Sequence, residues 1–254
     1  MRKNIIYYFS GTGNCLAVAK TIAAQISNCE IISMSSYDHY NLEHEYESIG
    51  FIYPVYFQGL PLKVENFVSK LNLPDNEKTF YYAIVTYGAM PGITIAQLAR
   101  LLKNKNVILD YGAKLKMFSN YIVAYDMGKN VAEKTLRSEK DLIPIIQDIQ
   151  NKKTSKIKKV NPVLDFYYHL WAKKIPELDK NFVVSQTCIS CGVCKKICPV
   201  QNIQLHDGKP EFNHHCEQCM ACIQFCPEKA INFKNWTQKR RRYNHPHIRY
   251  EDMI

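Results

Sequence analysis

The sequence predicts an α/β protein, with a doubly wound parallel sheet followed by a small α+β domain that is rich in cysteine. Short apolar runs alternate with segments of helical apolar spacing through the first 150 residues, as in parallel sheets covered by helices. Several of these runs end in a loop that contains glycine. Eight of the ten cysteines lie between Cys188 and Cys226. We therefore divide the chain into a sheet domain at 1–150, a helical basic linker at 151–180, a cysteine-rich domain at 181–234 and a basic C-terminal tail at 235–254.

The first strand is expected at 4–9, and the segment Ser-Gly-Thr-Gly-Asn-Cys at 10–15 follows it directly. Apolar residues at helical spacing then predict a helix over 16–26. A strand, a glycine-rich turn and a helix form a phosphate cradle, because glycine allows close backbone approach and a helix N-terminus attracts an anion. The loop lacks the lysine of nucleoside-triphosphate loops and the third glycine of dinucleotide-binding loops. An ordinary turn between strand and helix is the alternative.

Four further strands complete the expected sheet, at 30–33, 48–53, 80–86 and within 107–117, where Tyr111-Gly112 interrupts the pattern. Helices are expected at 61–71, from the Gly92 loop to Leu102, and at 131–151. Pro144 should kink the last of these helices.

Two more loops follow strands and contain residues suited to a ligand. Proline and aromatic side chains at the carboxyl end of a strand suggest a flat ligand, although Tyr56, Phe57 and Tyr87 could also simply pack within the domain. The candidate residues are Pro54, Val55, Tyr56 and Phe57 in one loop, and Thr86, Tyr87, Gly88 and Gly92 in the other.

The linker contains a basic run at 152–159 and an aromatic, amphipathic segment at 163–175. We expect this segment to pack the two domains together, with contact to a membrane surface as the alternative. The side chains expected to make the packing are Phe166, Tyr167, Leu170 and Trp171.

The cysteine-rich segment contains the pattern C-x2-C-x2-C-x3-C-P twice. The first copy is Cys188, Cys191, Cys194, Cys198 and Pro199, and the second is Cys216, Cys219, Cys222, Cys226 and Pro227. This run binds [4Fe-4S] clusters in bacterial proteins, because a cubane cluster needs four thiolates around one small core. Zinc is one alternative, but zinc sites usually use two separated pairs of cysteines. Disulfides are the other, and they would require an exported chain.

The same segment resembles bacterial two-[4Fe-4S] ferredoxins over roughly 182–233, including the Asp207-Gly208 turn between the two runs. In that family the fourth cysteine of each run ligates the other cluster. The resemblance therefore implies cluster I on Cys188, Cys191, Cys194 and Cys226, and cluster II on Cys216, Cys219, Cys222 and Cys198.

The first domain resembles a flavodoxin in its loop at 10–15, and the segment Phe118-Ser-Asn-Tyr-Ile resembles one that closes many such domains. The resemblance implies the strand order 2-1-3-4-5, with FMN at the carboxyl ends of the strands where the order reverses. The loops at 54–57 and 86–92 would then flank the flavin ring. Cys15 departs from the usual hydroxyl residue of the phosphate loop, and a thiol is a weaker donor. The implied phosphate loop consists of Ser10, Thr12, Gly13, Asn14 and Cys15.

The net charge of +10 comes mostly from residues after position 128. Because charge steers encounter, we expect a redox partner protein with an acidic docking surface, and we find no nucleic-acid-binding module. No stretch approaches the ~20 apolar residues of a membrane span. The apolar run after Met1-Arg2-Lys3 is too short for a secretory signal, so we expect a cytoplasmic protein.

Taken together, the two halves resemble bacterial flavodoxin–ferredoxin fusion electron carriers. This resemblance implies an electron-transfer protein that passes electrons between two [4Fe-4S] clusters, FMN and an external redox partner. The main alternative is an FMN-dependent oxidoreductase that reduces a small organic substrate with electrons delivered through its own clusters. No acid–base constellation for such a reaction is visible in the sequence. A redox-sensing binding protein is the third hypothesis.

Overall fold

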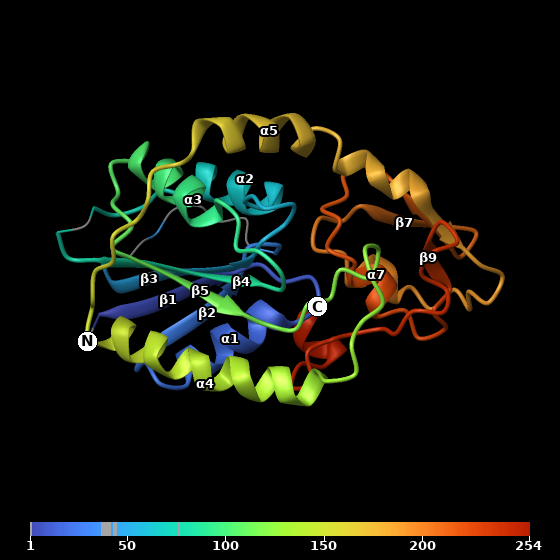
Figure 1. The fold of residues 1–254 in the computed structure, drawn as a ribbon, viewed down its shortest axis with the longest axis horizontal. Coiled ribbons are helices and arrows are strands. Elements are labelled where there is room, and N and C mark those ends of the chain that lie inside the picture. The colour runs from blue at the N-terminus through green and yellow to red at the C-terminus, as the bar shows by residue number, and fades with distance from the viewer. Residues whose placement is uncertain (1, 37–41, 43–44, 76) are drawn as a thin grey trace.

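Five parallel strands form the sheet of the first domain, in the order β2-β1-β3-β4-β5 (Figure 1). The computed structural model describes residues 2–36, 42, 45–75 and 77–254. The order is that of a flavodoxin-like doubly wound sheet, so the expected fold class and strand order are confirmed. The strands are β1 (Lys3–Tyr8), β2 (Cys29–Ser33), β3 (Tyr46–Pro54), β4 (Phe80–Tyr87) and β5 (Tyr111–Lys116).

Helices cover both faces of this sheet (Figure 1). α1 (Asn14–Ala23) and α4 (Val131–Gln150) contribute to one apolar core, and α2 (Leu62–Lys70) and α3 (Thr94–Lys103) to the other. The central strands β1, β3 and β4 are buried from both sides, and they are nearly continuous apolar runs, as such strands require. Pro144 lies inside α4, which runs as one helix from Val131 to Gln150.

The fifth strand is shorter than the apolar pattern at 107–117 suggests. Val107 and Leu109 are buried in the core but precede the strand. The Asp110 side chain accepts a hydrogen bond from Tyr81 N at 2.8 Å. The side chain thus occupies the position of a strand partner, and pairing with β4 begins one residue later, at Tyr82 and Tyr111.

The cysteine-rich domain contains two small antiparallel sheets. β6 (Phe182–Val184) pairs with β9 (Ile231–Phe233), and β7 (Ile203–His206) pairs with β8 (Lys209–Phe212). The β7–β8 hairpin turns at Asp207 and Gly208, both with positive φ, as a two-residue hairpin loop requires. Two short helices, α6 (Val193–Lys196) and α7 (Ala221–Gln224), begin within the two cysteine runs.

Helix α5 (Pro162–Ala172) lies on the outside of α2 and α3 (Figure 1). Its inward side chains are Asp165, Tyr168 and Ala172. Asp165 accepts a hydrogen bond from Gln97 Nε2 at 2.9 Å and forms an ion pair with Arg100, both on α3. The Tyr168 hydroxyl donates to the Leu60 carbonyl.

The prediction that the large apolar side chains of this segment pack the domains together is wrong. Phe166, Tyr167, Leu170 and Trp171 are 61%, 64%, 47% and 45% exposed, respectively. The polar anchor at Asp165 and the ring of Tyr168 fix the opposite side of α5 against the first domain. Hydrophobicity alone therefore pointed to the wrong face of this helix.

The C-terminal residues 235–254 pack over both domains. Thr237, Tyr243, His245 and Ile248 are buried, and the segment ends in the short 3₁₀ helix η2 (Tyr250–Met253). Within the described part of the chain, no helix is long and apolar enough to cross a bilayer.

Candidate functional site

A cavity of about 290 Å³ lies at the carboxyl ends of β1, β3 and β4. This is near the lower end of ligand pockets, which span roughly 300–1,000 Å³. The strand order reverses between β1 and β3, where ligands of open α/β sheets bind. Candidate residues from all three loops line it: Ser10, Thr12, Asn14, Cys15, Pro54, Val55, Tyr56, Phe57, Thr86, Tyr87 and Gly88.

Two candidate glycines lie behind the cavity wall. Gly13 precedes α1 with φ of +92°, and a Cβ there would lie 3.0 Å from the Cβ of Ile248. Gly92 is held against the neighbouring loop, where Ile93 N donates to the Gln58 carbonyl at 2.9 Å. Both glycines shape the loops and do not face the cavity.

The loop between β1 and α1 presents neutral hydrogen-bond donors. Ser10 Oγ accepts a hydrogen bond from Gly13 N at 3.1 Å, which tightens the loop. Thr12 Oγ1 accepts from Asn120 Nδ2, so the Thr12 hydroxyl hydrogen is left to donate elsewhere. No side chain of the described residues caps the α1 N-terminus, so its first amides can receive an anion. A phosphate group therefore fits this loop.

Cys15 connects the loop to the end of β4. Its Sγ atom lies 3.1 Å from Thr86 Oγ1. Burial raises the pKa of the Cys15 thiol to about 12, despite the opposing hydrogen bond from Thr86. The residue therefore remains a neutral thiol at physiological pH.

Tyr56 and Phe57, in the loop that follows β3, line the cavity and also pack against neighbouring side chains. Burial raises the pKa of Tyr56 well above its usual value, and the negative charge that Cys219 carries as a thiolate raises this pKa further. Phe57 has a φ of +49°, and its ring contacts Tyr121 and Trp171 at centroid distances of 5.8 and 6.4 Å. Loop strain of this kind persists where the surrounding packing fixes it.

Sequence reasoning missed much of the opposite wall of the cavity. The resemblance of 118–122 to a closing segment was a signal for part of this wall, but nothing local marks the contribution of the cysteine-rich domain. The added lining residues are Gly11, Gln58, Ala89, Met90, Phe118, Ser119, Asn120, Tyr121, Tyr125, Gln218, Cys219 and Met220.

The first cysteine group surrounds a separate small cavity, which is lined by Cys188, Cys191, Cys194 and Cys226 among others. Burial raises the pKa of Cys194 to about 11, and the nearby thiols of Cys191, Cys226 and Cys188 also raise it. Cys226 Sγ accepts a hydrogen bond from Ala230 N at 3.3 Å. The fourth cysteine of the second run thus lies with the first three of the other run.

The second group is arranged in the same crossed way. Burial raises the pKa of Cys219, and the thiols of Cys198 and Cys216 raise it further. Burial likewise raises the pKa of Cys222, with Cys216, Cys219 and Cys198 adding to it. Cys198 Sγ accepts from Asn202 N at 3.2 Å, which repeats the contact at Cys226. Four thiols of each group are therefore close enough to interact.

The two cysteine runs have the same backbone conformation. Positive φ occurs at Ser190 and Gly192 in the first run and at Gln218 and Met220 in the second, at matching offsets from the first cysteine. Among the described residues, no three His, Cys, Asp or Glu side chains meet as ligands of a single metal ion. Cubane thiolates bind four different irons and need not meet at one point. The residues present therefore fit iron–sulfur clusters.

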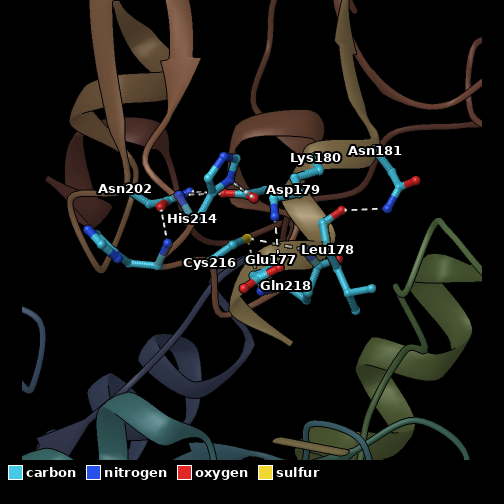
Figure 2. Close-up of polar contacts among 10 residues, drawn as sticks. Glu177, Leu178, Asp179, Lys180, Asn181, Asn202, His214, Cys216 and Gln218 are labelled. Carbon is cyan, nitrogen blue, oxygen red and sulfur yellow. Dashed lines mark hydrogen bonds and ion pairs between the residues drawn. The ribbon is translucent and has the colours of Figure 1, made fainter. Parts of the chain in front are cut away.

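A buried carboxylate holds the loop that leads into the second cysteine run (Figure 2). Asp179, on the 3₁₀ helix η1 (Pro176–Asn181), is 1% exposed. It accepts hydrogen bonds from Asn202 Nδ2 at 2.7 Å and from His214 N at 3.2 Å, and it lies 2.7 Å from His214 Nδ1. Gln218 then donates to Cys216 Sγ from its backbone N and its Nε2, at 3.2 and 3.3 Å. This network fixes the position of Cys216.

Two further contacts fasten the domains together around the cavity. Glu217 is buried and accepts from Lys63 N at the start of α2, so its carboxylate lies at a helix N-terminus. Burial raises the pKa of Glu217 to about 7, although backbone hydrogen bonds from Lys63 and Leu62 act to lower this pKa. Across the cavity, Tyr243 of the C-terminal segment donates to Asn14 Oδ1 at 2.7 Å.

Comparison with known proteins identifies iron–sulfur relatives for the cysteine-rich segment. Residues 187–231 match the family model of a 4Fe-4S dicluster domain. One component of the ion-translocating oxidoreductase complex of Methanosarcina acetivorans is 35% identical over 57 residues, which are 22% of this chain and 22% of that protein. The ferredoxin of Pyrobaculum islandicum is 31% identical over 61 residues, 23% of this chain and 57% of that protein. The chain thus spans less than two thirds of the length of these relatives.

Among solved structures, rubredoxin oxygen:oxidoreductase of Desulfovibrio gigas aligns with 60% of this chain and 37% of its own, at 12% identity and a TM-score of 0.41. The fold assignment stands on the strand order and the parallel pairing of this chain. The strand order gives the first domain a flavodoxin-like fold, and residues 187–231 of the second domain match a 4Fe-4S dicluster domain. This pairing supports electron transfer with the involvement of a flavin.

The Asp179 network can be tested by substitution. Asp179→Ala leaves the buried amide of Asn202 without its acceptor, which costs about 1–3 kcal/mol, and also removes the acceptor of the half-exposed His214. We expect the free energy of unfolding to fall accordingly, measured by denaturant titration of the cluster-loaded protein under anaerobic conditions. Glu177→Ala on the same 3₁₀ helix removes only an exposed ion pair with Lys180 and should change little. Equal losses in the two variants would show that the buried network is not what matters.

The contact between the C-terminal segment and Asn14 gives a second prediction. Tyr243→Phe removes the hydroxyl but keeps the ring, which stacks on Phe118 at a centroid distance of 4.7 Å. Losing this bond should weaken flavin binding by about 0.5–1.5 kcal/mol, roughly 2- to 12-fold in Kd. Flavin titration followed by fluorescence measures the change. Tyr250→Phe is the matched control, because the Tyr250 hydroxyl has no hydrogen-bond partner among the described residues. An unchanged Kd in Tyr243→Phe would contradict a role for this bond.

Proposed function

We propose that this chain is an electron-transfer protein that holds two [4Fe-4S] clusters and FMN and exchanges electrons with an external redox partner. When bound, the clusters supply one-electron steps and the flavin supplies one- or two-electron steps. The observation that carries the proposal is the position of Cys219, which lies in the wall of the flavin cavity and against the loop at 10–15. A ligand cysteine in this wall makes the flavin site and a cluster site direct neighbours.

The crossed grouping of the cysteines supports two cluster sites. Cys188, Cys191, Cys194 and Cys226 would hold cluster I, and Cys216, Cys219, Cys222 and Cys198 would hold cluster II. Hydrogen bonds from Ala230 N and Asn202 N to the crossing cysteines would stabilise the thiolate form. Cys219 belongs to the second group, so cluster II would lie nearer to the flavin than cluster I.

The flavin cavity suits electron transfer better than proton transfer to a substrate. None of the described residues that line it carries a carboxylate, an imidazole, an ammonium or a guanidinium group. Burial raises the pKa of Tyr121 to about 12, and the pKa of Tyr56 also lies well above its usual range, so both phenols stay protonated. Proton exchange with an organic substrate in this cavity would therefore depend on phenols that are weak acids near neutral pH.

An acidic partner would find its docking surface at the first cysteine group. Cys191 and the nearby Lys195 and Lys196 are exposed. Two arginines of the C-terminal segment are committed elsewhere: Arg240 donates to the Ile122 and Val123 carbonyls, and Arg242 donates to Asn232 Oδ1. The free positive charge around cluster I would favour encounter with a partner of negative surface.

Selectivity for FMN can be measured at the phosphate loop. Thr12→Val removes one hydroxyl donor to the phosphate and should weaken FMN binding by about 1–3 kcal/mol. Riboflavin has no phosphate, so it should bind the wild type much more weakly than FMN does. The variant should bind riboflavin as well as the wild type does. Thr21→Val is the control, because Thr21 lies on exposed α1 surface and its hydroxyl bonds the Ala17 carbonyl. Equal wild-type affinity for FMN and riboflavin would contradict the phosphate site.

Paired cysteine variants test the crossed ligands. Cys198→Ala with Cys216→Ala removes two ligands of cluster II only, so iron analysis and electron paramagnetic resonance should find one intact [4Fe-4S] cluster. Cys198→Ala with Cys188→Ala removes one ligand from each cluster, so both should be damaged. The opposite pattern would show that each run binds its own cluster.

The same variants test the function itself. Cys198→Ala should keep most of its FMN affinity, because Cys198 does not line the cavity and the phosphate loop lies in the first domain. Reduction of the bound flavin by a one-electron donor should slow by about tenfold or more, equivalent to about 1.4 kcal/mol in activation free energy. Stopped-flow absorbance measures the rate of flavin reduction in the wild type and in the variant. If flavin reduction is as fast in the variant that has lost cluster II as in the wild type, the proposed electron transfer from cluster II to the flavin is contradicted.

A further inference from the structure

The outer face of α5 is a continuous apolar surface. Six large side chains of this helix are 45–64% exposed, although such residues are usually buried in a protein of this size. They follow the spacing of one broad helical face, and Asp165 and Tyr168 on the opposite side anchor the helix to the protein. The six are Val163, Leu164, Phe166, Tyr167, Leu170 and Trp171. Contiguous exposed apolar surfaces of this kind mark interaction sites.

This surface is formed before any binding event. Asn161 Oδ1 accepts hydrogen bonds from Val163 N at 3.0 Å and Leu164 N at 3.2 Å, and Pro162 occupies the first helical position. Both features stabilise a helix N-terminus. The ion pair of Asp165 with Arg100 fixes the rotation of the helix about its axis. The apolar face is therefore presented to solvent in a fixed orientation.

Positive charge flanks the apolar face at both ends. Exposed lysines lie just before the helix and directly after it, and none of them forms an ion pair with a carboxylate of the described residues: Lys156, Lys158, Lys159, Lys173 and Lys174. The one carboxylate within α5, Asp165, is buried and paired. The exposed segments that flank α5 at both ends thus carry lysines that no carboxylate of α5 neutralises.

We propose that the outer face of α5 docks this protein on an anionic lipid surface. Aromatic side chains such as Trp171 and Tyr167 favour the boundary between headgroups and acyl chains, and lysines beside them attract anionic headgroups. The helix would lie in the plane of the interface, with its apolar face in the lipid and Asp165 toward the protein. Phe57, which lines the flavin cavity, contacts Trp171, so the docked face would lie beside that cavity.

The shape of the surface favours lipid over a protein partner. Protein partners that recognise a helix through its apolar side chains provide a groove for it, whereas here the helix projects from the outside of the molecule (Figure 1). A bilayer surface deforms around such a ridge and needs no matching groove. An acidic protein could pair its carboxylates with the lysines. It would also need a complementary apolar surface for the six large side chains of α5.

Flotation with lipid vesicles tests the proposal on the full chain loaded with its cofactors. Vesicles of equimolar phosphatidylcholine and phosphatidylglycerol should carry the protein, and vesicles of phosphatidylcholine alone should carry about tenfold less or none. Phe166→Ser with Trp171→Ser should lower partition into the anionic vesicles by about tenfold or more. Lys173→Glu with Lys174→Glu should abolish the preference for anionic lipid. Raising the salt concentration should weaken the binding of the wild type to anionic vesicles.

A matched control comes from α4, where Leu136 and Ile143 are 58% and 54% exposed. Leu136→Ser with Ile143→Ser should leave partition unchanged. In a Trp236→Phe background, Trp171 emission should shift to the blue when anionic vesicles are added. The proposal is wrong if the wild type ignores both vesicle types, if the α4 variant loses as much as the α5 variant, or if Trp171 emission does not move. It is also wrong if α5 substitution instead disrupts a dimer or slows electron delivery by an added redox protein in the absence of lipid.

Discussion

The close contact of Gly11 with Cys219 is the constraint on which the rest of this structure depends. A Cβ at Gly11 would lie 2.7 Å from the Cys219 carbonyl oxygen and 2.8 Å from its Cβ, so only a glycine allows the two backbones to touch. Gly11 is part of the loop at 10–15, and Cys219 is one of the eight cysteines in the segment that matches a 4Fe-4S dicluster domain. Their contact brings the cavity at the sheet edge directly against the second cysteine run, with no side chain of Gly11 between them.

The surrounding contacts hold this junction in place from several directions. Glu217, two residues before Cys219, binds the N-terminus of α2. Gln224 of α7 donates to the Asn120 carbonyl at 2.8 Å and accepts from Tyr243 N at 2.7 Å, which ties the iron–sulfur domain to the closing segment and to the C-terminal residues. His245 N then donates to the Thr12 carbonyl at 2.9 Å. Because each bond joins a different pair of segments, the two domains form one continuous structure around the cavity.

This organisation changes the meaning of the basic residues in the chain. Two arginines near the C-terminus satisfy carbonyl and amide oxygens of the protein: Arg240 donates to the Ile122 and Val123 carbonyls, and Arg242 to Asn232 Oδ1. They serve the interface between the domains more than any external partner. Lys195, Lys196 and the lysines around α5 are among the basic side chains that stay exposed. Net charge alone could not distinguish these roles, since it does not show which side chains are already paired.

The sequence by itself determined the parts that depend on local pattern. Period and composition located the five strands, the glycine loop at 10–15, the Asp207-Gly208 hairpin and the two cysteine runs, because each is encoded within a few adjacent residues. The tertiary structure alone decided which distant segments complete each site. It placed Cys219 and Gln218 in the flavin cavity and Tyr243 against Asn14, contacts between residues far apart in the chain that no periodic signal records. It also decided which face of α5 is buried, because the partners of Asp165, Gln97 and Arg100, lie on α3 and belong to another part of the chain, while Phe166 and Trp171 stay exposed.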